Sequence, residues 1–280
     1  MTTAVAAPFR FFSLQVVRTR RVGPSVVRVT FAGDDLRAFH SHGRDQSLSL
    51  FLPHPGQSEP AVPIELGEAW WQGWRELPDD VRAVMRSYTL RALRREPDEI
   101  DIDFVLHGVE PGASVPAGPA SLWASRATAG DRVVLMGPAV ADNRAIRFRP
   151  PEDTDLVVIW ADETAVPAAS AVLEWLPVGT RAHVWLEAGH AGDIQDLATE
   201  ADAEVTWLTD GTGSPTALEV LRGAELPDAR APYVWIAGES GHVKELRRHF
   251  VGERGIDRRR VTFVGYWRQG MSEEQLRTEE

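Results

Sequence analysis

The sequence predicts a protein of two domains, an antiparallel β-barrel followed by an α/β domain with a parallel sheet. Short strand-like segments alternate with turn-rich stretches from residue 12 to about residue 137, which is typical of an antiparallel barrel. Pro150-Pro151 then interrupts the chain, and beyond it strand-like and helix-like segments alternate. We therefore expect a barrel domain over residues 1–150, an α/β domain over 151–270 and an acidic C-terminal tail over 271–280.

The barrel half contains short apolar segments of the kind that form half-buried strands. They include Phe12–Arg18, Val26–Phe31 and Ser47–Leu52. Residues 53–81 are rich in Pro, Gly and Trp, which indicates a long excursion between strands. The sequence leaves two roles open for this excursion: it covers a bound ligand, or it packs on the barrel.

The second half alternates between apolar runs and helical segments. Four βα units in succession imply a parallel sheet with right-handed crossovers and helices on both faces. Ser214-Pro215 supplies an N-cap residue followed by proline, which is a favourable helix start. We expect strands at 155–161, 181–187, 203–209, 232–238 and 260–266, and helices at about 165–176, 191–199, 214–223 and 241–252.

Composition excludes several classes of function. The formal net charge of −11 argues against non-specific nucleic-acid binding, which depends on neutralising phosphates. Without cysteine the chain holds no disulfide, redox-active dithiol or cysteine-ligated iron–sulfur cluster. Its eight histidines form no metal-binding spacing, so we expect no metal site. No run approaches the length of a membrane span and the first residues do not form a signal sequence, so we expect a cytoplasmic protein without membrane insertion.

The segment Arg86-Ser87-Tyr88-Thr89-Leu90-Arg91 combines the groups that hold a flavin dinucleotide. A guanidinium makes paired hydrogen bonds to phosphate oxygens, a phenol ring offers a flat stacking face, and a threonine hydroxyl both donates to and accepts from ring nitrogens. In a strand, Arg86 and Tyr88 share one face while Thr89 and Arg91 share the other, so a ligand that uses both must lie at a strand end or bend. The alternative is a solvated basic strand with one aromatic residue.

Two later segments have features of nucleotide-binding loops. Small residues around Gly118 allow backbone N–H groups to come close to a phosphate, and Ser121 is placed to cap or to open a helix, although a plain strand-to-helix turn has the same composition. The apolar strand before Asp162 runs directly into acidic and hydroxyl residues and then into an alanine-rich helix. Ligands of parallel sheets bind beyond such carboxyl ends of strands.

Together with the ending Val264-Gly265-Tyr266-Trp267-Arg268-Gln269-Gly270, these segments resemble the siderophore-interacting protein family, also called ferric-siderophore reductases. That family belongs to the ferredoxin–NADP reductase-like flavoproteins, and the resemblance extends from about Phe12 to Gly270. It implies that the barrel binds FAD and that the α/β domain binds NADH or NADPH as electron donor. It also implies that the cofactor-binding residues are Arg86, Ser87, Tyr88, Thr89, Arg91, His107, Gly118, Pro119, Ala120, Ser121, Asp162, Glu163, Thr164, Ala165, Gly238, Glu239 and Trp267.

The function implied by this resemblance is reduction of siderophore-bound ferric iron to ferrous iron. Arg268 would bind the ferric siderophore, and no residue would act in acid–base catalysis. Two other classes remain open: a general flavin reductase that serves another electron acceptor, and a siderophore-binding module with little turnover. The sequence does not determine the oligomeric state, and a monomer is compatible with it.

The chain departs from the usual family pattern at two places. Relatives often carry a lysine where Ser49 stands, so the charge of the siderophore is left open. Many relatives carry an arginine near Thr209 or Asp210 that pairs with the extra phosphate of NADPH, whereas an aspartate repels that phosphate. We therefore expect NADH to be at least as good a donor as NADPH.

Overall fold

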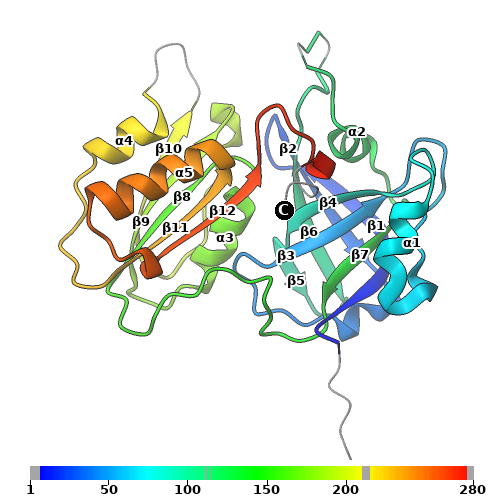
Figure 1. The fold of residues 1–280 in the computed structure, drawn as a ribbon, viewed down its shortest axis with the longest axis horizontal. Helices are drawn as coiled ribbons and strands as arrows, with labels where there is room; N and C mark the ends of the chain where they lie inside the picture. Colours follow the sequence, from blue (N-terminus) through cyan, green and yellow to red (C-terminus); the bar gives the residue numbers. More distant parts are fainter. Residues whose placement is uncertain (1–6, 111, 114, 210–214, 276–280) are drawn as a thin grey trace, which may run out of the picture. The chain divides into compact units, whose positions relative to one another are not determined.

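The structure, a computed structural model, describes residues 7–110, 112–113, 115–209 and 215–275. The chain divides into two compact units, Met1–Ile146 and Arg147–Glu280, called here the N-terminal and C-terminal units. The first is built on an antiparallel sheet and the second on a parallel sheet (Figure 1), so the predicted order of fold classes is confirmed. The change falls a few residues before Pro150. In the described part of the chain, no helix is long and apolar enough to cross a membrane.

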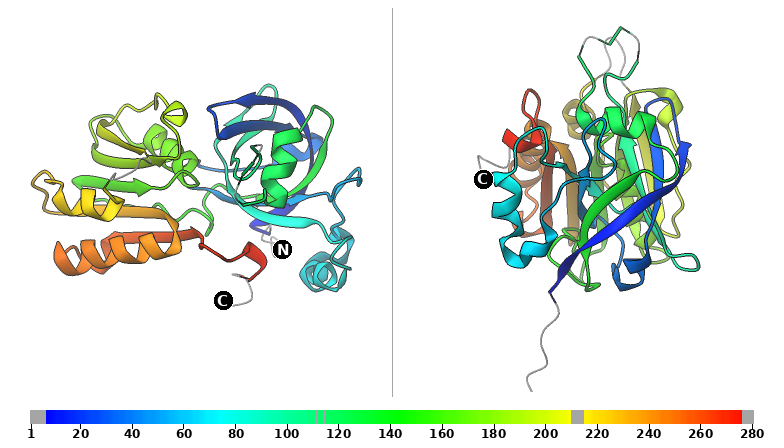
Figure 2. Two further views of the ribbon diagram at one scale, coloured as in Figure 1. Left: turned by 90° about the horizontal axis from the view of Figure 1, so that it is seen from above. Right: turned by 90° about the vertical axis from the view of Figure 1, so that its right-hand side faces the viewer.

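The N-terminal unit contains one curled sheet in which every neighbouring pair of strands is antiparallel (Figure 2, left). Alternate apolar side chains face the inside, where Phe12, Phe31 and Phe104 are fully buried. The order across the sheet is β4-β3-β7-β1-β2-β6-β5. The strands are β1 (Phe9–Arg21), β2 (Val26–Ala32), β3 (Ser47–Leu52), β4 (Val84–Thr89), β5 (Ala92–Arg94), β6 (Glu99–Val105) and β7 (Arg132–Pro138).

A short piece of chain joins the two edges of this sheet. β4 and β5 are the outermost strands, yet only Leu90 and Arg91 separate them in the sequence. The Leu90 amide donates to the carbonyl of Gln46 at 2.9 Å, and the Arg91 amide donates to that of Asp101, also at 2.9 Å. The barrel is therefore closed by this crossing and not by a continuous ladder of strands. The crossing places the predicted flavin motif at a bend.

The excursion over residues 53–81 packs on the outside of the barrel. It contains a 3-10 helix, Ile64–Ala69, followed by α1 (Trp70–Glu76). The Trp70 ring lies edge-on to those of Phe11 and Phe51, with centroids 5.0 and 5.8 Å away. These contacts form a small apolar cluster separate from the interior of the barrel. A second helix, α2 (Pro119–Arg126), packs against β6.

The C-terminal unit has a parallel sheet with helices on both faces (Figure 1). The order β10-β9-β8-β11-β12 places the almost wholly buried strands β8 and β11 next to each other in the interior. α3 (Val166–Trp175) covers one face, and α4 (Ala217–Gly223) and α5 (Ser240–Arg248) cover the other. The strands are β8 (Leu156–Ala161), β9 (Arg181–Ala188), β10 (Asp202–Thr209), β11 (Pro232–Glu239) and β12 (Val261–Trp267).

The prediction of a helix over residues 191–199 is wrong. Only a 3-10 turn, Ala191–Asp193, forms there, and irregular chain follows it. Gly192 disfavours a helix, and the hydroxyl of Thr199 donates to the Leu173 carbonyl at 2.8 Å, which holds the irregular segment against α3.

The helix expected from Ser214 also begins elsewhere. α4 starts after Thr216, whose hydroxyl accepts the Glu219 amide while the Glu219 carboxylate accepts the Thr216 amide. This reciprocal capping box fixes the start of the helix, and Ser214 lies outside the described residues. α5 ends at Arg248, and a π-helical turn, His249–Glu253, follows it directly.

Candidate functional site

The carboxyl edge of the parallel sheet brings together residues from three strand ends. Asp162 follows β8, Glu239 ends β11 and Trp267 ends β12. β11 lies between β8 and β12 in the sheet, so these three ends are neighbours. Three of the predicted cofactor-binding residues therefore lie at the edge where parallel sheets bind ligands.

The Asp162 carboxylate links these strand ends from a buried position, with an exposed fraction of 4 %. One oxygen accepts the amide and hydroxyl of Thr164 at 2.9 and 2.6 Å and the Ala165 amide at 3.3 Å. The other accepts the Glu239 amide and the Trp267 indole N–H, both at 2.7 Å. Burial raises the pKa of Asp162, and the hydrogen bonds from Thr164, Trp267 and Glu239 offset part of that rise. The acceptor sites of this carboxylate are thus used within the protein.

The Glu239 carboxylate caps the N-terminal end of α5. It accepts the amides of Gly241 and His242 on one oxygen and that of Gln269 on the other. Burial acts to raise the pKa of Glu239, but the hydrogen bonds from these three amides outweigh it and leave the pKa lowered. A carboxylate therefore already occupies the helix end that would otherwise attract a phosphate.

Two glycines allow these strand ends to pack closely. Gly238 has a φ of 147°, and a Cβ placed on it would lie 2.4 Å from Cγ of Asp162. A Cβ on Gly265 would lie 2.5 Å from the Ser240 hydroxyl at the start of α5. Side chains at either position would push the neighbouring segments apart.

The aromatic residues at the end of β12 have different surroundings. Tyr266 packs against the core on the α3 face of the sheet. Trp267 has an exposed fraction of 40 % although its N–H is bound to buried Asp162. Arg268 follows directly and is exposed. The chain ending thus presents an indole ring and a guanidinium at the carboxyl edge.

The three predicted residues that follow Asp162 differ in how far they are buried. The hydroxyl of Thr164 is bound to Asp162, and the side chain of Ala165 is fully buried. Glu163 is half-buried and lies beside Gly189, where an added Cβ would approach the Glu163 carboxylate to 2.8 Å. Ala165 takes part only through its backbone amide, which donates to Asp162.

In the N-terminal unit, the predicted flavin residues lie along β4 and the crossing that follows it. Arg86 is half-buried and Ser87 is exposed. The Tyr88 ring packs on Phe104, with centroids 4.4 Å apart. Thr89 has an exposed fraction of only 6 %. A guanidinium, two hydroxyls and a phenol ring thus follow one another along an edge strand of the curled sheet, and the Thr89 hydroxyl is on the buried side.

Arg91 lies beside a row of buried carboxylates on β6 that sequence reasoning missed. Its Nε is 4.0 Å from Asp103, which also accepts two hydrogen bonds from Arg28. Asp101 and Glu99 continue the row at alternate positions of the strand. The signal in the sequence is the alternation of acidic and apolar residues in Glu99–Phe104, next to arginine-bearing strands.

The loop before α2 confirms one of the two roles predicted for Ser121. Gly118 is the N-cap of α2 and no side chain caps the helix, so Ser121 does not cap it, but it does lie at the opening of the helix. Ser121 lies inside the first turn, where its hydroxyl donates to the Val105 carbonyl at 3.2 Å and accepts the His107 amide at 3.3 Å. It fastens the helix to the end of β6. A Cβ on Gly118 would meet nothing within 4 Å, so this helix end is open.

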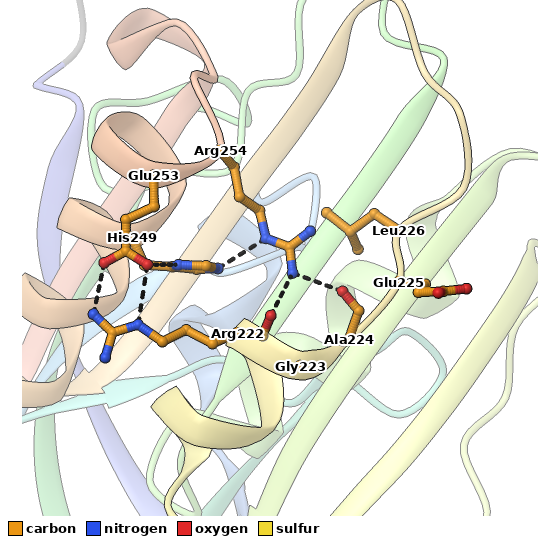
Figure 3. Close-up of a pocket in the computed structure, with 8 residues that line it drawn as sticks. All are labelled: Arg222, Gly223, Ala224, Glu225, Leu226, His249, Glu253 and Arg254. Carbon is orange, nitrogen blue, oxygen red and sulfur yellow. Dashed lines mark hydrogen bonds and ion pairs between the residues drawn. The ribbon is translucent and has the colours of Figure 1, made fainter.

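A pocket of about 660 Å³ lies elsewhere in the C-terminal unit, between α4 and the π-helical turn (Figure 3). Four of its side chains form one network: Arg222 makes two hydrogen bonds to Glu253, and His249 lies between Glu253 and Arg254. Hydrogen bonds from Arg222 and then His249 lower the pKa of Glu253 to about 2. Arg254 also donates to carbonyls at the end of α4. The network joins α4 to the π-helical turn. None of the predicted site residues lines the pocket.

The two units together define a class of protein. A curled antiparallel sheet followed by a parallel α/β unit is the ferredoxin reductase-like fold of FAD/NAD-binding domains. The family model for the siderophore-interacting FAD-binding domain matches residues 15–142, and that for the siderophore-interacting protein matches residues 154–270. The chain belongs to the siderophore-interacting protein family.

Individual relatives match along nearly the whole chain. The ferric vibriobactin reductase ViuB of Vibrio cholerae is 29% identical over 93% of this chain and 90% of its own. The NADPH-dependent ferric-chelate reductase of Escherichia coli is 30% identical over 92% of this chain and 93% of its own. Among solved structures, the siderophore-interacting protein SipS from Aeromonas hydrophila is 31% identical over 96% of both chains, with a TM-score of 0.75.

Proposed function

We propose that this protein is an FAD-dependent ferric-siderophore reductase that takes electrons from NADH or NADPH. One observation carries the proposal: similarity extends along both units to proteins named as ferric vibriobactin reductase and ferric-chelate reductase, over 93% and 92% of this chain. The similarity covers the barrel and the α/β unit together, so it applies to a whole electron-transfer protein and not to one binding module.

The N-terminal unit supplies the FAD site in this proposal. The residues present fit such a ligand, because Arg86 offers a cation for a phosphate, Tyr88 offers a ring, and the end of α2 at Gly118 is open. Bound FAD would supply the conversion of a two-electron hydride donor into single electrons. The proposed contacts are Arg86, Ser87, Tyr88, Thr89, Arg91, His107, Gly118, Pro119, Ala120 and Ser121.

The C-terminal unit supplies the donor site. The backbone amides at the start of α3 and of α5 already donate to the carboxylates of Asp162 and Glu239. The phosphates of the dinucleotide should therefore bind away from these two helix ends. Trp267 offers an indole ring for the nicotinamide, and Arg268 offers a cation for an anionic siderophore.

Iron is the substrate in this scheme. Hard oxygen donors hold ferric iron more strongly than ferrous iron, so one-electron reduction weakens the complex and releases the metal. No group of three or more His, Asp or Glu side chains in the described part of the chain is arranged to hold a metal ion. The protein therefore needs to bind the siderophore and position it, and no acid–base residue is required.

The test is an anaerobic assay. NADH or NADPH is mixed with the purified protein and a panel of ferric catecholate, hydroxamate and citrate complexes, and ferrous iron is trapped with a coloured chelator. We expect ferrous iron to form faster than with free reduced flavin for at least one complex. Arg268→Ala should raise the KM for anionic complexes most, whereas the exposed Arg258→Ala serves as the matched control.

Two results would redirect the assignment. Flavin that is reduced by the nucleotide, without accelerated ferrous iron for any complex, would favour a general flavin reductase with another acceptor. Tight siderophore binding without turnover would favour a binding module. We also propose a cytoplasmic location, because nicotinamide nucleotides are supplied there, and recovery of the protein in another cell fraction would contradict it.

A further inference from the structure

The buried Asp162 and the exposed Trp267 are joined by a short hydrogen bond. The indole N–H donates to Oδ2 of Asp162 at 2.7 Å. Asp162 has an exposed fraction of 4 %, whereas Trp267 has one of 40 %. One edge of the indole is thus fixed inside the protein while much of the ring remains accessible.

Two further contacts hold the same piece of chain. The Ser240 hydroxyl donates to the Trp267 carbonyl at 2.9 Å, and the Gln269 amide donates to Glu239 at 3.2 Å. The backbone on both sides of Arg268 is therefore tied to the start of α5. The indole bond to Asp162 then adds the constraint that sets the orientation of the Trp267 ring.

Asp162 itself is held rigidly enough to serve as an anchor. Its other oxygen is bound by Thr164 and Ala165, which lead into α3, and its Oδ2 also accepts the Glu239 amide at the end of β11. Gly238 brings the backbone of β11 against the carboxylate, at a position where no side chain fits. The anchor is thus supported by two strands and one helix.

From this geometry we infer that Asp162 is a positioning residue: it does not touch the nucleotide, but it orients the Trp267 indole, whose exposed face bounds the site of the donor nicotinamide. The inference rests on the proposed function, which requires a nicotinamide at the carboxyl edge of the sheet. It reassigns Asp162 from direct cofactor binding, because its acceptor sites are used by protein donors. A free indole would sample several rotamers, and the anchored one presents a single surface.

The first test needs neither cofactor nor turnover. With 15N-labelled tryptophan, the Trp267 indole resonance is identified by its loss in Trp267→Phe. We expect its N–H to exchange slowly with solvent in the wild type and at least about tenfold faster in Asp162→Asn, because an amide NH₂ or a misplaced oxygen no longer accepts it. The matched control is Asp155→Asn, since Asp155 precedes the same strand, β8, and accepts the amides of Arg230 and Ala231 at the opposite edge.

The second test is stopped-flow reduction of the bound flavin by NADH and NADPH. Asp162→Asn and Trp267→Phe should each lower the limiting rate roughly tenfold or more, and the double variant should be no slower than the slower single variant, because both remove one interaction. Trp267→Phe keeps an aromatic ring and leaves the other contacts of Asp162 in place, so it tests the inference even if Asp162→Asn does not fold. Trp175→Phe, at an indole with the same 40 % exposed fraction at the end of α3, is its control.

Several outcomes would overturn the inference. They are unchanged indole exchange in Asp162→Asn, strictly additive losses in the double variant, and losses of equal size in Asp155→Asn or Trp175→Phe. If neither nucleotide reduces the flavin of the wild-type protein, the proposed function fails. The hydrogen-exchange experiment can still be read in that case, because it needs neither nucleotide nor turnover, so the two failures are distinguishable.

Discussion

Arg86 and Arg91 begin and end the same six-residue motif but lie in different environments. Arg86 is half-buried on β4, whereas Arg91 follows the strand and lies beside Asp103. The charge of Arg91 is thus partly balanced by a carboxylate of the barrel, whereas the Arg86 guanidinium donates to the Met85 carbonyl at 2.7 Å.

We predict that Arg86→Ala lowers FAD occupancy strongly. Loss of a charge-assisted contact that is shielded from water costs about 2–5 kcal/mol. Occupancy is measured by the flavin absorbance of the purified protein, and Arg132→Ala, at an exposed arginine on β7, is the control. Full flavin retention in Arg86→Ala would count decisively against the assignment.

A substitution at Gly238 tests how closely the strand ends pack. Gly238→Ala should destabilise the C-terminal unit by about 2 kcal/mol or more, because φ is unfavourable and the new Cβ collides with Asp162. Gly223→Ala is the control, since a Cβ there meets nothing within 4 Å and replaces a helical glycine. Urea unfolding followed by circular dichroism measures both, and equal midpoints for the two variants would refute the packing argument.

At the scale of elements, β6 carries the most heavily charged buried row of the N-terminal unit. Asp101 accepts two hydrogen bonds from Arg94 at 2.6 and 2.7 Å and one from Thr30 at 2.6 Å. Burial acts to raise the pKa of Asp101, but the hydrogen bonds from Arg94 and Thr30 outweigh it and lower the pKa. The pKa of Glu99 is also lowered, first by its hydrogen bond from Arg18.

The lowered pKa values predict that this strand is acid-sensitive. A carboxylate whose folded pKa lies below its unfolded pKa contributes stability above the unfolded value, near pH 4, and loses it as the pH falls through the folded value. Asp101→Asn should be less stable than the wild type at neutral pH but should lose less stability between about pH 6 and pH 3. Urea midpoints across this range measure the effect. The exposed Glu59→Gln is the control, and parallel pH profiles for Asp101→Asn and the wild type would contradict the prediction.

At the scale of the whole molecule, the choice of electron donor depends on cations around the α/β unit. Thr209 ends β10 and is exposed, while Asp210 lies outside the described residues. Arg222, on α4, is bound to Glu253 by two hydrogen bonds. Lys244 is exposed on α5. Of these two cations, Arg222 is already paired with a carboxylate, so Lys244 is the one to test against the extra phosphate of NADPH.

We predict that NADH reduces the flavin at least as fast as NADPH does. The measurement is stopped-flow bleaching at equal donor concentrations, and Lys244→Gln should leave the ratio of the two rates unchanged. A tenfold preference for NADPH would refute the prediction. Loss of that preference in Lys244→Gln or Arg222→Gln would then identify the cation responsible.

The amino-acid sequence by itself determined the order of the two units and the positions of most strands. These properties depend on local periodicity and on residue types within a few positions of one another. The predicted helix over residues 191–199 failed because Gly192 disfavours a helix and Thr199 is bound by the distant Leu173. Only the tertiary structure decided that Leu90 and Arg91 join the edges of the barrel and that carboxylates form a buried row on β6. It also decided that Asp162 anchors Glu239 and Trp267, because those partners are 77 and 105 residues away and meet only when the parallel sheet forms.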